Sequence, residues 1–295
     1  MRRFTKPTTF LLGVIMMAFG LLACQQSGRQ PEPVVSVSIQ PLKYFIDRLT
    51  EEALEVNVMV PPGASHSTYA PTTQQFMRLS DSGIYIRIGY LGYEQAWIGR
   101  LRELNPTMTV LNLSDHTELI QGDVIDHGDH VHEGGIDPHI WMSPRVMQSL
   151  LPKIKEVIAD VYPELTEVVE QNYLLLEKEL AALDEAFIEL SEELPQKSFM
   201  IYHPALTYLA RDYGFAQISI EHEGKEPSPA MLQRIIRDAR EHDIPVIFIQ
   251  AEYDMRSAEL VSNETGAKLA QINPEGYNWL EIMTEVADLM LKHMR

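Results

Sequence analysis

Between Pro144 and Leu194 the sequence is rich in Leu, Glu, Ala and Val, and turn signals are nearly absent except around Tyr162 and Pro163. This pattern predicts two successive helices. Ser143 and Pro144 suit the N-cap and the first position of the first helix. The second would begin at Pro163 and end at Leu194, a length of about 45 Å at 1.5 Å per residue. We expect so long a helix to join two halves of the fold.

Apolar runs of strand length alternate with helical patterns on both sides of these helices. The expected strands are residues 34–39, 56–60, 84–88 and 108–113, followed in the second half by 199–202, 217–220, 246–250 and 268–272. Helical patterns lie between them, as at Leu42–Leu49 and Thr72–Leu79, and an amphipathic helix from Tyr277 to Met294 closes the chain. Such alternation predicts an α/β fold with two Rossmann-like lobes, parallel sheets and a ligand site in the cleft between the lobes.

The N-terminus has the layout of a secretory signal peptide. Arg2, Arg3 and Lys6 precede an apolar run at 10–22, which is too short for a confident transmembrane helix. The run ends in Leu-Leu-Ala-Cys, which resembles a bacterial lipobox and makes Cys24 the expected lipidated residue. The alternative is a chance cysteine beside an uncleaved anchor helix.

These features divide the chain into five expected parts. They are a signal peptide (1–23), a flexible tether (24–33), an N-terminal α/β lobe (34–162), the linking helix (163–194) and a C-terminal α/β lobe (195–295). Cys24 is the only cysteine, so an acylated mature chain has neither a free thiol nor a disulfide. Its stability must then come from its core.

The charge of the chain is strongly acidic, with 42 Asp and Glu against 24 Lys and Arg. Three of the basic residues would leave with the signal peptide. Such a charge repels nucleic acid phosphates and concentrates cations, so we expect no nucleic acid partner. Solubility alone would also account for it.

Three histidines occupy positions where loops should begin at the carboxyl ends of strands. His66 follows the expected strand 56–60, His203 follows 199–202 directly, and His139 precedes the helix at Pro144. Neutral imidazole is the commonest protein ligand for zinc, and three of them can form most of a tetrahedral site. Each alone could be a capping or packing residue, but their common placement favours a metal site.

A second group of histidines, His127, His130 and His132, alternates with carboxylates in a glycine-containing stretch at 126–135. This composition suits an auxiliary loop that binds metal weakly and reversibly. Asp115 and His116 lie upstream and could join it. The alternative is a solvated polar loop without a role.

Three motifs carry a resemblance to a known family. They are Pro-Gly-Ala-Ser-His-Ser-Thr-Tyr-Ala-Pro at 62–71, Asp-Pro-His-Ile-Trp-Met-Ser-Pro at 137–144, and Tyr-His-Pro-Ala at 202–205 with Tyr208, Tyr213 and Gly214. With them, nearly the whole mature chain resembles the zinc and manganese substrate-binding proteins of ABC importers, in the cluster whose lobes are joined by a rigid helix. The acidic, histidine-rich insert before Asp137 looks like the loop of the zinc-selective members.

The resemblance implies a function and a ligand set. His66, His139 and His203 would bind Zn²⁺, with Mn²⁺ possible, as cargo rather than as the cofactor of an enzyme. The expected partner is an ABC-transporter permease. The protein would be a monomer, exported and lipid-anchored through Cys24 to a bacterial membrane, on its periplasmic or surface side.

The sequence departs from the family at two positions. Many members have an aspartate where this chain has Asn273, and a glutamate where it has Gln250. The identity of the fourth ligand is therefore open. In order of preference, we expect water or an exogenous ligand, Asn273, or a carboxylate such as Glu252. Without an anionic ligand the site would carry a charge of about +2, which should weaken affinity. Three imidazoles with water favour zinc over manganese.

Two other functions fit some of these features. A three-histidine zinc site with an open water position is also the arrangement of zinc hydrolases, although the sequence contains no His-Glu-x-x-His motif. A metal-binding adhesin or metal-buffering lipoprotein would need the same site without a transporter.

Overall fold

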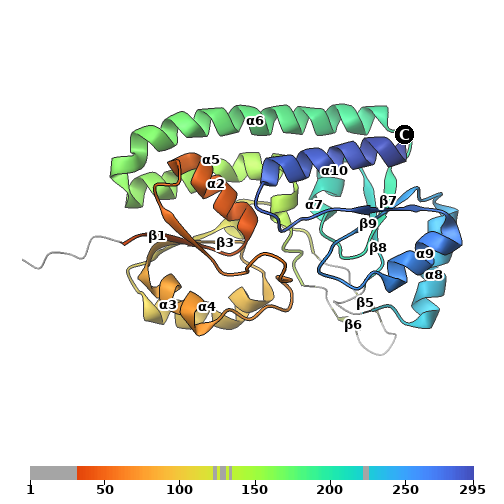
Figure 1. Cartoon of the computed structure of the whole chain (residues 1–295), viewed down its shortest axis with the longest axis horizontal. Helices are drawn as coiled ribbons and strands as arrows, with labels where there is room; N and C mark the ends of the chain where they lie inside the picture. The colour runs from red at the N-terminus through yellow and green to blue at the C-terminus, as the bar shows by residue number, and fades with distance from the viewer. Residues whose placement is uncertain (1–31, 122–124, 127–130, 133–134, 222–225) are drawn as a thin grey trace, which may run out of the picture. The chain divides into compact units, whose positions relative to one another are not determined.

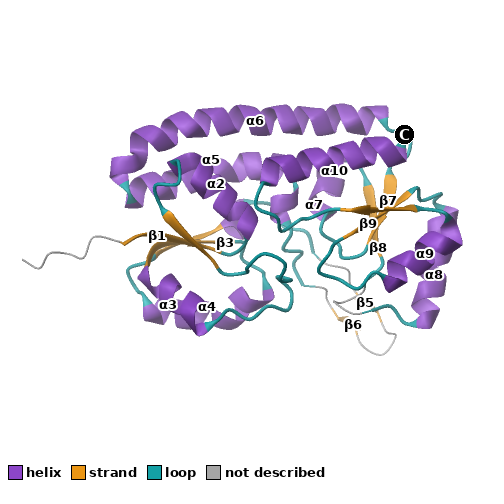
Figure 2. Cartoon of the chain, viewed as in Figure 1, coloured by secondary structure: helices purple, strands orange, loops and turns teal. Residues whose placement is uncertain are grey.

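Two four-stranded sheets account for the alternating halves of the sequence (Figure 2). The computed structural model describes residues 32–121, 125–126, 131–132, 135–221 and 226–295. The first sheet has the order β2 (Glu55–Val58), β1 (Glu32–Val37), β3 (Ser82–Arg87), β4 (Thr109–Asn112). The second has the order β10 (Lys268–Gln271), β9 (Val246–Ile249), β7 (Ser198–Ile201), β8 (Ala216–Ser219). The β1–β2, β3–β4, β7–β8, β7–β9 and β9–β10 pairs are all parallel, which confirms the predicted fold class.

The two sheets share one connectivity. In each half the first strand lies between the second and the third, so the strand order reverses beside it. Loops leaving the carboxyl ends of neighbouring strands diverge at such a point and leave room for a ligand. The ends of β1 and β3 form this point in the first sheet, and the ends of β7 and β9 form it in the second.

Burial on both faces explains why the strands are continuous apolar runs. All four residues of β9 are buried, and successive side chains of a strand point to opposite faces. Val246 and Phe248 belong to the main apolar core, whereas Ile247 and Ile249 pack in a smaller cluster. That smaller cluster includes residues of α8 (Pro229–Glu241) and α9 (Arg256–Thr265).

Helices cover both faces of the first sheet. Figure 1 shows α2 (Gln40–Thr50) and α5 (Pro144–Val161) on one face, and α3 (Thr73–Asp81) and α4 (Gly92–Leu104) on the other. Apart from the long helix α6 (Thr166–Glu193), the remaining elements are α7 (Thr207–Tyr213), α10 (Trp279–Met294), the short 3-10 helices η1 (Leu113–His116), η2 (Ile140–Met142) and η3 (Pro163–Leu165), and the antiparallel pair β5 (Ile125–Asp126) and β6 (Val131–His132).

The predicted pair of central helices is present. In α5, Pro144 is the first residue and the Ser143 hydroxyl accepts a hydrogen bond from the Val146 amide, as the sequence suggested. The long helix α6 spans Thr166–Glu193, 28 residues or about 42 Å, and begins after the 3-10 turn at Pro163 rather than at Pro163 itself. It packs on α5, α2 and α10 and so contacts helices of both halves (Figure 1).

One apolar core connects the two sheets. It includes Val35 and Ile86 of the first sheet, Phe187 of α6, and Phe199 and Phe248 of the second. Separating the halves would expose this shared surface to water, at a cost of about 25 cal/mol per Å². Only small relative movements of the two sheets are therefore compatible with the packing.

Several predicted features fall outside the described residues. They are the signal peptide, Cys24 and nearly all of the tether, together with His127 and His130 of the auxiliary loop. In the part of the chain that the structure describes, no helix combines the length and the apolar character needed to cross a bilayer.

Candidate metal centre

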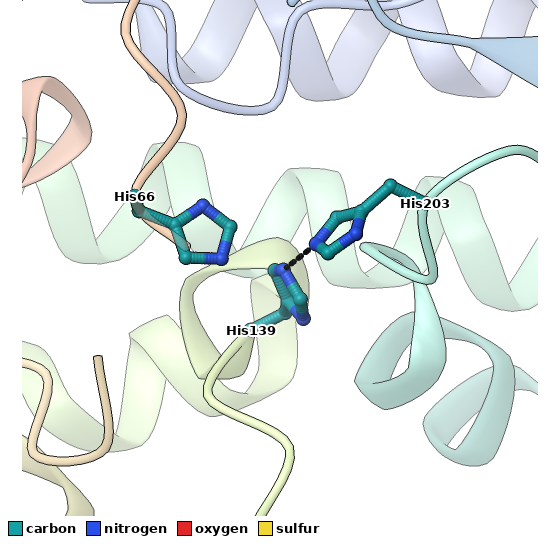
Figure 3. Close-up of side chains that lie close together, drawn as sticks. All are labelled: His66, His139 and His203. Atoms are coloured by element: carbon teal, nitrogen blue, oxygen red, sulfur yellow. Dashed lines mark hydrogen bonds between the residues drawn. The ribbon is translucent and has the colours of Figure 1, made fainter. Parts of the chain in front are cut away.

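His66, His139 and His203 meet beyond the ends of the strands. His66 lies in the loop between β2 and α3, His139 is the N-cap residue of η2, and His203 lies just after β7. One ring nitrogen of each lies within 4.8 Å of those of the other two. The side chains come from different sides and turn toward a common point (Figure 3). The exposed fractions of the three residues are 4%, 2% and 8%, so the meeting point is buried.

Each of the three imidazoles has a carboxylate on its Nδ1. Glu275 Oε1 lies 2.6 Å from His66 Nδ1, Asp137 Oδ1 lies 2.8 Å from His139 Nδ1, and Glu221 Oε2 lies 3.0 Å from His203 Nδ1. A carboxylate only accepts hydrogen bonds, so an imidazole that is neutral carries its proton on Nδ1 here. Each Nε2 is then an acceptor with the lone pair through which histidine binds a metal, and that of His66 lies 3.3 Å from the Ser67 hydroxyl, which an ion would have to displace.

The closest approach between two of these rings fits a zinc ion. His139 Nε2 and His203 Nε2 are 3.2 Å apart, and the lone pairs of two acceptors at that distance repel each other. In a tetrahedral site with zinc–nitrogen bonds of about 2.05 Å, two ligand nitrogens are about 3.3 Å apart. A cation bound by both nitrogens would therefore remove the repulsion without moving either ring far.

Two of these carboxylates also accept hydrogen bonds from the backbone amides of the histidines that they contact. Glu275 Oε1 accepts a hydrogen bond from the His66 amide at 3.2 Å, and Asp137 Oδ1 accepts one from the His139 amide at 2.9 Å. Because one oxygen fixes both the amide and the ring of the same residue, the ring has little freedom to turn. This preorganisation lowers the entropic cost of binding an ion.

Gln250 has a structural role at this site. Its Oε1 accepts a hydrogen bond from the His203 amide at 3.3 Å, and its Nε2 donates one to the His203 carbonyl at 2.8 Å. A glutamate cannot replace both contacts when ionised, because a carboxylate has no donor. The amide is thus suited to clamping the backbone of His203.

Two tryptophans hold the segment that carries Glu275. Trp141 Nε1 donates to the Pro274 carbonyl at 2.9 Å, and Trp279 Nε1 donates to the Trp141 carbonyl at 2.7 Å. Both indoles are fully buried. The Trp141 ring lies 5.1 Å from the His139 ring and 5.7 Å from the His66 ring, between centroids, so its fluorescence should report on the site.

The protonation states of His139 and Asp137 suit the binding of a cation. Burial lowers the pKa of His139 to about 4, although Asp137 opposes this shift. Burial by itself would raise the pKa of Asp137, but its charge interaction and hydrogen bonds with His139 outweigh it and hold that pKa below its usual value. Near neutral pH the ring is therefore neutral and the carboxyl group ionised.

The expected charge of about +2 counted only the groups that bind the ion directly. Glu275, Asp137 and Glu221 each lie one imidazole away from the predicted ion position. Carboxylates at this distance offset the charge of the ion and raise the basicity of the ligating nitrogens. An anionic fourth ligand is not required for charge balance.

The predicted fourth donors lie at different places. Asn273 is exposed, and its amide lies so close to Gly276 that a Cβ there would come within 2.8 Å of Asn273 Nδ2. Glu252 is half-buried in the loop between β9 and α9. Water, Asn273 and Glu252 as fourth ligands all stay predictions.

Glu275 and Glu221 were missed by the sequence argument. Glu275 lies two residues after Asn273, one of the positions at which the sequence departs from the family. Glu221 follows β8 at the same edge of the sheet as His203. A search for acids after every predicted strand would have found Glu221. Nothing local to Glu275 indicates that it contacts His66, which lies 209 residues earlier.

The auxiliary loop is described only in part. His132 lies in β6, which pairs with β5, and Asp115 and His116 are exposed in η1. The Asp115 carboxylate accepts a hydrogen bond from the Asn112 amide group at 2.7 Å. Metal binding by this loop stays a prediction.

The sequence matches one protein family and several individual relatives. The profile of the family described as "ZnuA: Zinc-uptake complex component A periplasmic" matches residues 35–292. The zinc-binding lipoprotein AdcA of Streptococcus pneumoniae serotype 4 is 26% identical over 294 residues, which cover 95% of this chain and 56% of AdcA. This chain thus spans little more than half the length of that relative. The high-affinity zinc uptake system protein ZnuA of Bacillus subtilis is 24% identical over 275 residues, 87% of this chain and 86% of the relative.

Solved structures share the fold. A crystal structure of ZnuA superposes with a TM-score of 0.80 at 29% identity, covering 89% of this chain and 99% of that one. A ZnuA deletion mutant with zinc bound superposes with a TM-score of 0.79 at 30% identity, covering 88% and 97%. The periplasmic zinc-binding protein TroA of Treponema pallidum, at 16% identity and a TM-score of 0.76, covers 89% of this chain and 99% of that one and shows likeness of fold alone.

Proposed function

Because this chain belongs to the family of periplasmic A components of zinc-uptake complexes, we propose that it captures zinc with His66, His139 and His203 and delivers it to an ABC-transporter permease. The observation that carries this proposal is the arrangement of the three rings. Each has its Nδ1 on a carboxylate, and Nε2 atoms of two of them face each other at 3.2 Å. An imidazole whose other ring nitrogen donates to a carboxylate is typical of histidines that bind a metal, which supports the proposal.

Nitrogen donors favour zinc as the cargo. Imidazole suits zinc, whereas manganese prefers oxygen donors and lies low in the affinity order of divalent metals. Names of relatives, a zinc-binding lipoprotein and a zinc uptake protein, agree with this choice. Manganese is the alternative cargo.

The same site is better suited to holding an ion than to hydrolysis. A zinc hydrolase needs a base beside the metal-bound water. Here Glu275, Asp137 and Glu221 each contact the Nδ1 of an imidazole instead. We expect the zinc-loaded protein to be inactive toward ester and peptide substrates.

The remaining parts of the chain would serve capture and location. Cys24 would anchor the protein as a monomeric lipoprotein at the bacterial cell envelope, on the periplasmic or surface side, and AdcA is likewise described as a lipoprotein. His127, His130 and His132 would form a weak auxiliary metal loop. Deleting 127–132 should then leave the tight site intact.

Metal titration of the purified protein tests the proposal. We expect one tight zinc site per chain, a change in tryptophan fluorescence from Trp141 on binding, and preference for zinc over manganese by at least about tenfold, or about 1.4 kcal/mol. Absence of tight zinc binding would contradict the proposed function, and displacement of zinc by equimolar manganese would contradict the cargo. Zinc uptake by cells lacking the protein tests delivery.

A substitution at Asn273 tests the fourth position. Because Asn273 is exposed and its amide lies against Gly276, Asn273→Asp should change zinc affinity by less than about twofold. The measurement is a competition titration against a chelating dye. Tightening of tenfold or more would instead place residue 273 on the ion and exclude water from that position.

A further inference from the structure

Tyr253 bridges the two sides of the metal centre. Its hydroxyl lies 3.2 Å from Ser65 Oγ, in the loop that carries His66. Its ring stacks on the His203 ring with centroids 4.7 Å apart and an interplanar angle of 14°. Tyr253 itself lies in the loop between β9 and α9, so one side chain joins loops that follow strands of different sheets.

The surroundings fix both ends of this bridge. On one side, Ser65 Oγ also accepts a hydrogen bond from the Ser67 amide at 3.2 Å, which holds the Ser65 side chain against the segment 65–67 that contains His66. On the other, the Tyr253 ring packs on Tyr202 with centroids 5.7 Å apart. Each end of the bridge therefore has a second contact within its own side of the site.

Release of an ion requires such a separation. Ions bound by His66 and His203 can leave only when the nitrogens from the two sides move apart, since all three rings are buried. The shared apolar core limits this movement to a small one. A contact that spans the same gap must break during it, and its strength then adds to the barrier for release.

We propose that Tyr253 is a positioning residue that latches the loop of His66 to the side of His203 and thereby slows release of the bound zinc. This inference rests on the proposed function. The ring holds the plane of His203, and the hydroxyl holds the loop of Ser65. Tyr253 is not a metal ligand in this scheme.

Tyr253→Phe isolates the latch, because it removes the hydroxyl and keeps the ring on His203. The zinc-loaded full chain is mixed with excess chelating dye, and the release rate is followed by dye absorbance in a stopped-flow instrument. We expect release to be about three- to tenfold faster, the range of one net hydrogen bond. Ser65→Ala removes the same contact and also the acceptor of the Ser67 amide, so its increase should be at least as large. In the double variant the increase should be smaller than the product of the two single increases, because both changes remove the contact between Tyr253 and Ser65.

A matched control removes a tyrosine hydroxyl elsewhere. Tyr213 donates to Asp184 Oδ1 at 2.7 Å on α6, so Tyr213→Phe loses a comparable hydrogen bond away from the histidines. Its release rate should equal that of the unmodified protein, and thermal unfolding should show all variants folded. Release rates of Tyr253→Phe and Ser65→Ala within twofold of the unmodified protein would overturn the latch. Multiplicative effects in the double variant would overturn it too.

Failure of the latch and failure of the proposed function give different results. If the unmodified chain binds no zinc, the proposed function is wrong. If it binds zinc tightly and His203→Ala abolishes this while Tyr253→Phe has no effect on release, only the latch is wrong.

Discussion

Substituting any one of His66, His139 and His203 by alanine is expected to weaken zinc binding at least about a hundredfold, or about 2.7 kcal/mol. One of three nitrogen donors is lost in each case. The substitution also leaves a carboxylate without its donor. For His203→Ala this is Glu221, which is only 6% exposed. A buried acceptor left unpaired lowers the folding stability by about 1–3 kcal/mol, so the variant should also be less stable.

Competition titration against a chelating dye measures this effect. His242→Ala is the matched control, because His242 is exposed in the turn after α8 and its Nδ1 contacts a backbone carbonyl. Its zinc affinity should equal that of the unmodified protein. Unchanged affinity in two of the three histidine variants would refute the ligand assignment.

Glu221→Gln is expected to weaken zinc binding about ten- to a hundredfold, although Glu221 does not contact the ion. The amide oxygen of glutamine can still accept the hydrogen bond from His203 Nδ1, so the ring keeps a partner. What is lost is the negative charge that raises the basicity of Nε2 and offsets the charge of the ion. Asp137→Asn and Glu275→Gln should act in the same direction, through His139 and His66.

The matched control for these changes is Glu264→Gln. Glu264 forms an exposed ion pair with Arg240 at 3.0 Å, and such pairs contribute about 0–1 kcal/mol to stability. Its variant should bind zinc as the unmodified protein does. If Glu221→Gln also keeps full affinity, the carboxylates only orient the rings, and their charge has no part in binding.

The architecture was largely predictable from local patterns. Helical and strand periodicity depend on residues close in sequence, so the eight strands, the Ser143–Pro144 cap and the long helix could be anticipated. The boundaries shifted by a few residues, as at the start of α6, where the first turn after Pro163 is a 3-10 helix. The helix α4 lies between the expected strands 84–88 and 108–113, where the alternation predicts a helix, but the sequence argument gave no boundaries for it.

The sequence also determined which residues gather at the site. Loops after parallel strands emerge at one edge of a sheet, so the placement of His66 and His203 after strands was sufficient to predict that they lie near a common ligand position. His139 was added by its place just before the helix at Pro144, and the resemblance of its motif agreed. None of this required knowledge of distances.

Only the tertiary structure decided what surrounds each ring. Glu275 and His66 are 209 residues apart, Tyr253 and Ser65 are 188 apart, and no periodic pattern links such pairs. Their contacts arise because α6 and the shared core bring the two sheets together and so fix which loops face each other. Local sequence sets the position of a residue along its own element, whereas the packing of elements sets its partners. The local charge balance of the metal centre, which depends on those partners, therefore became apparent only in three dimensions.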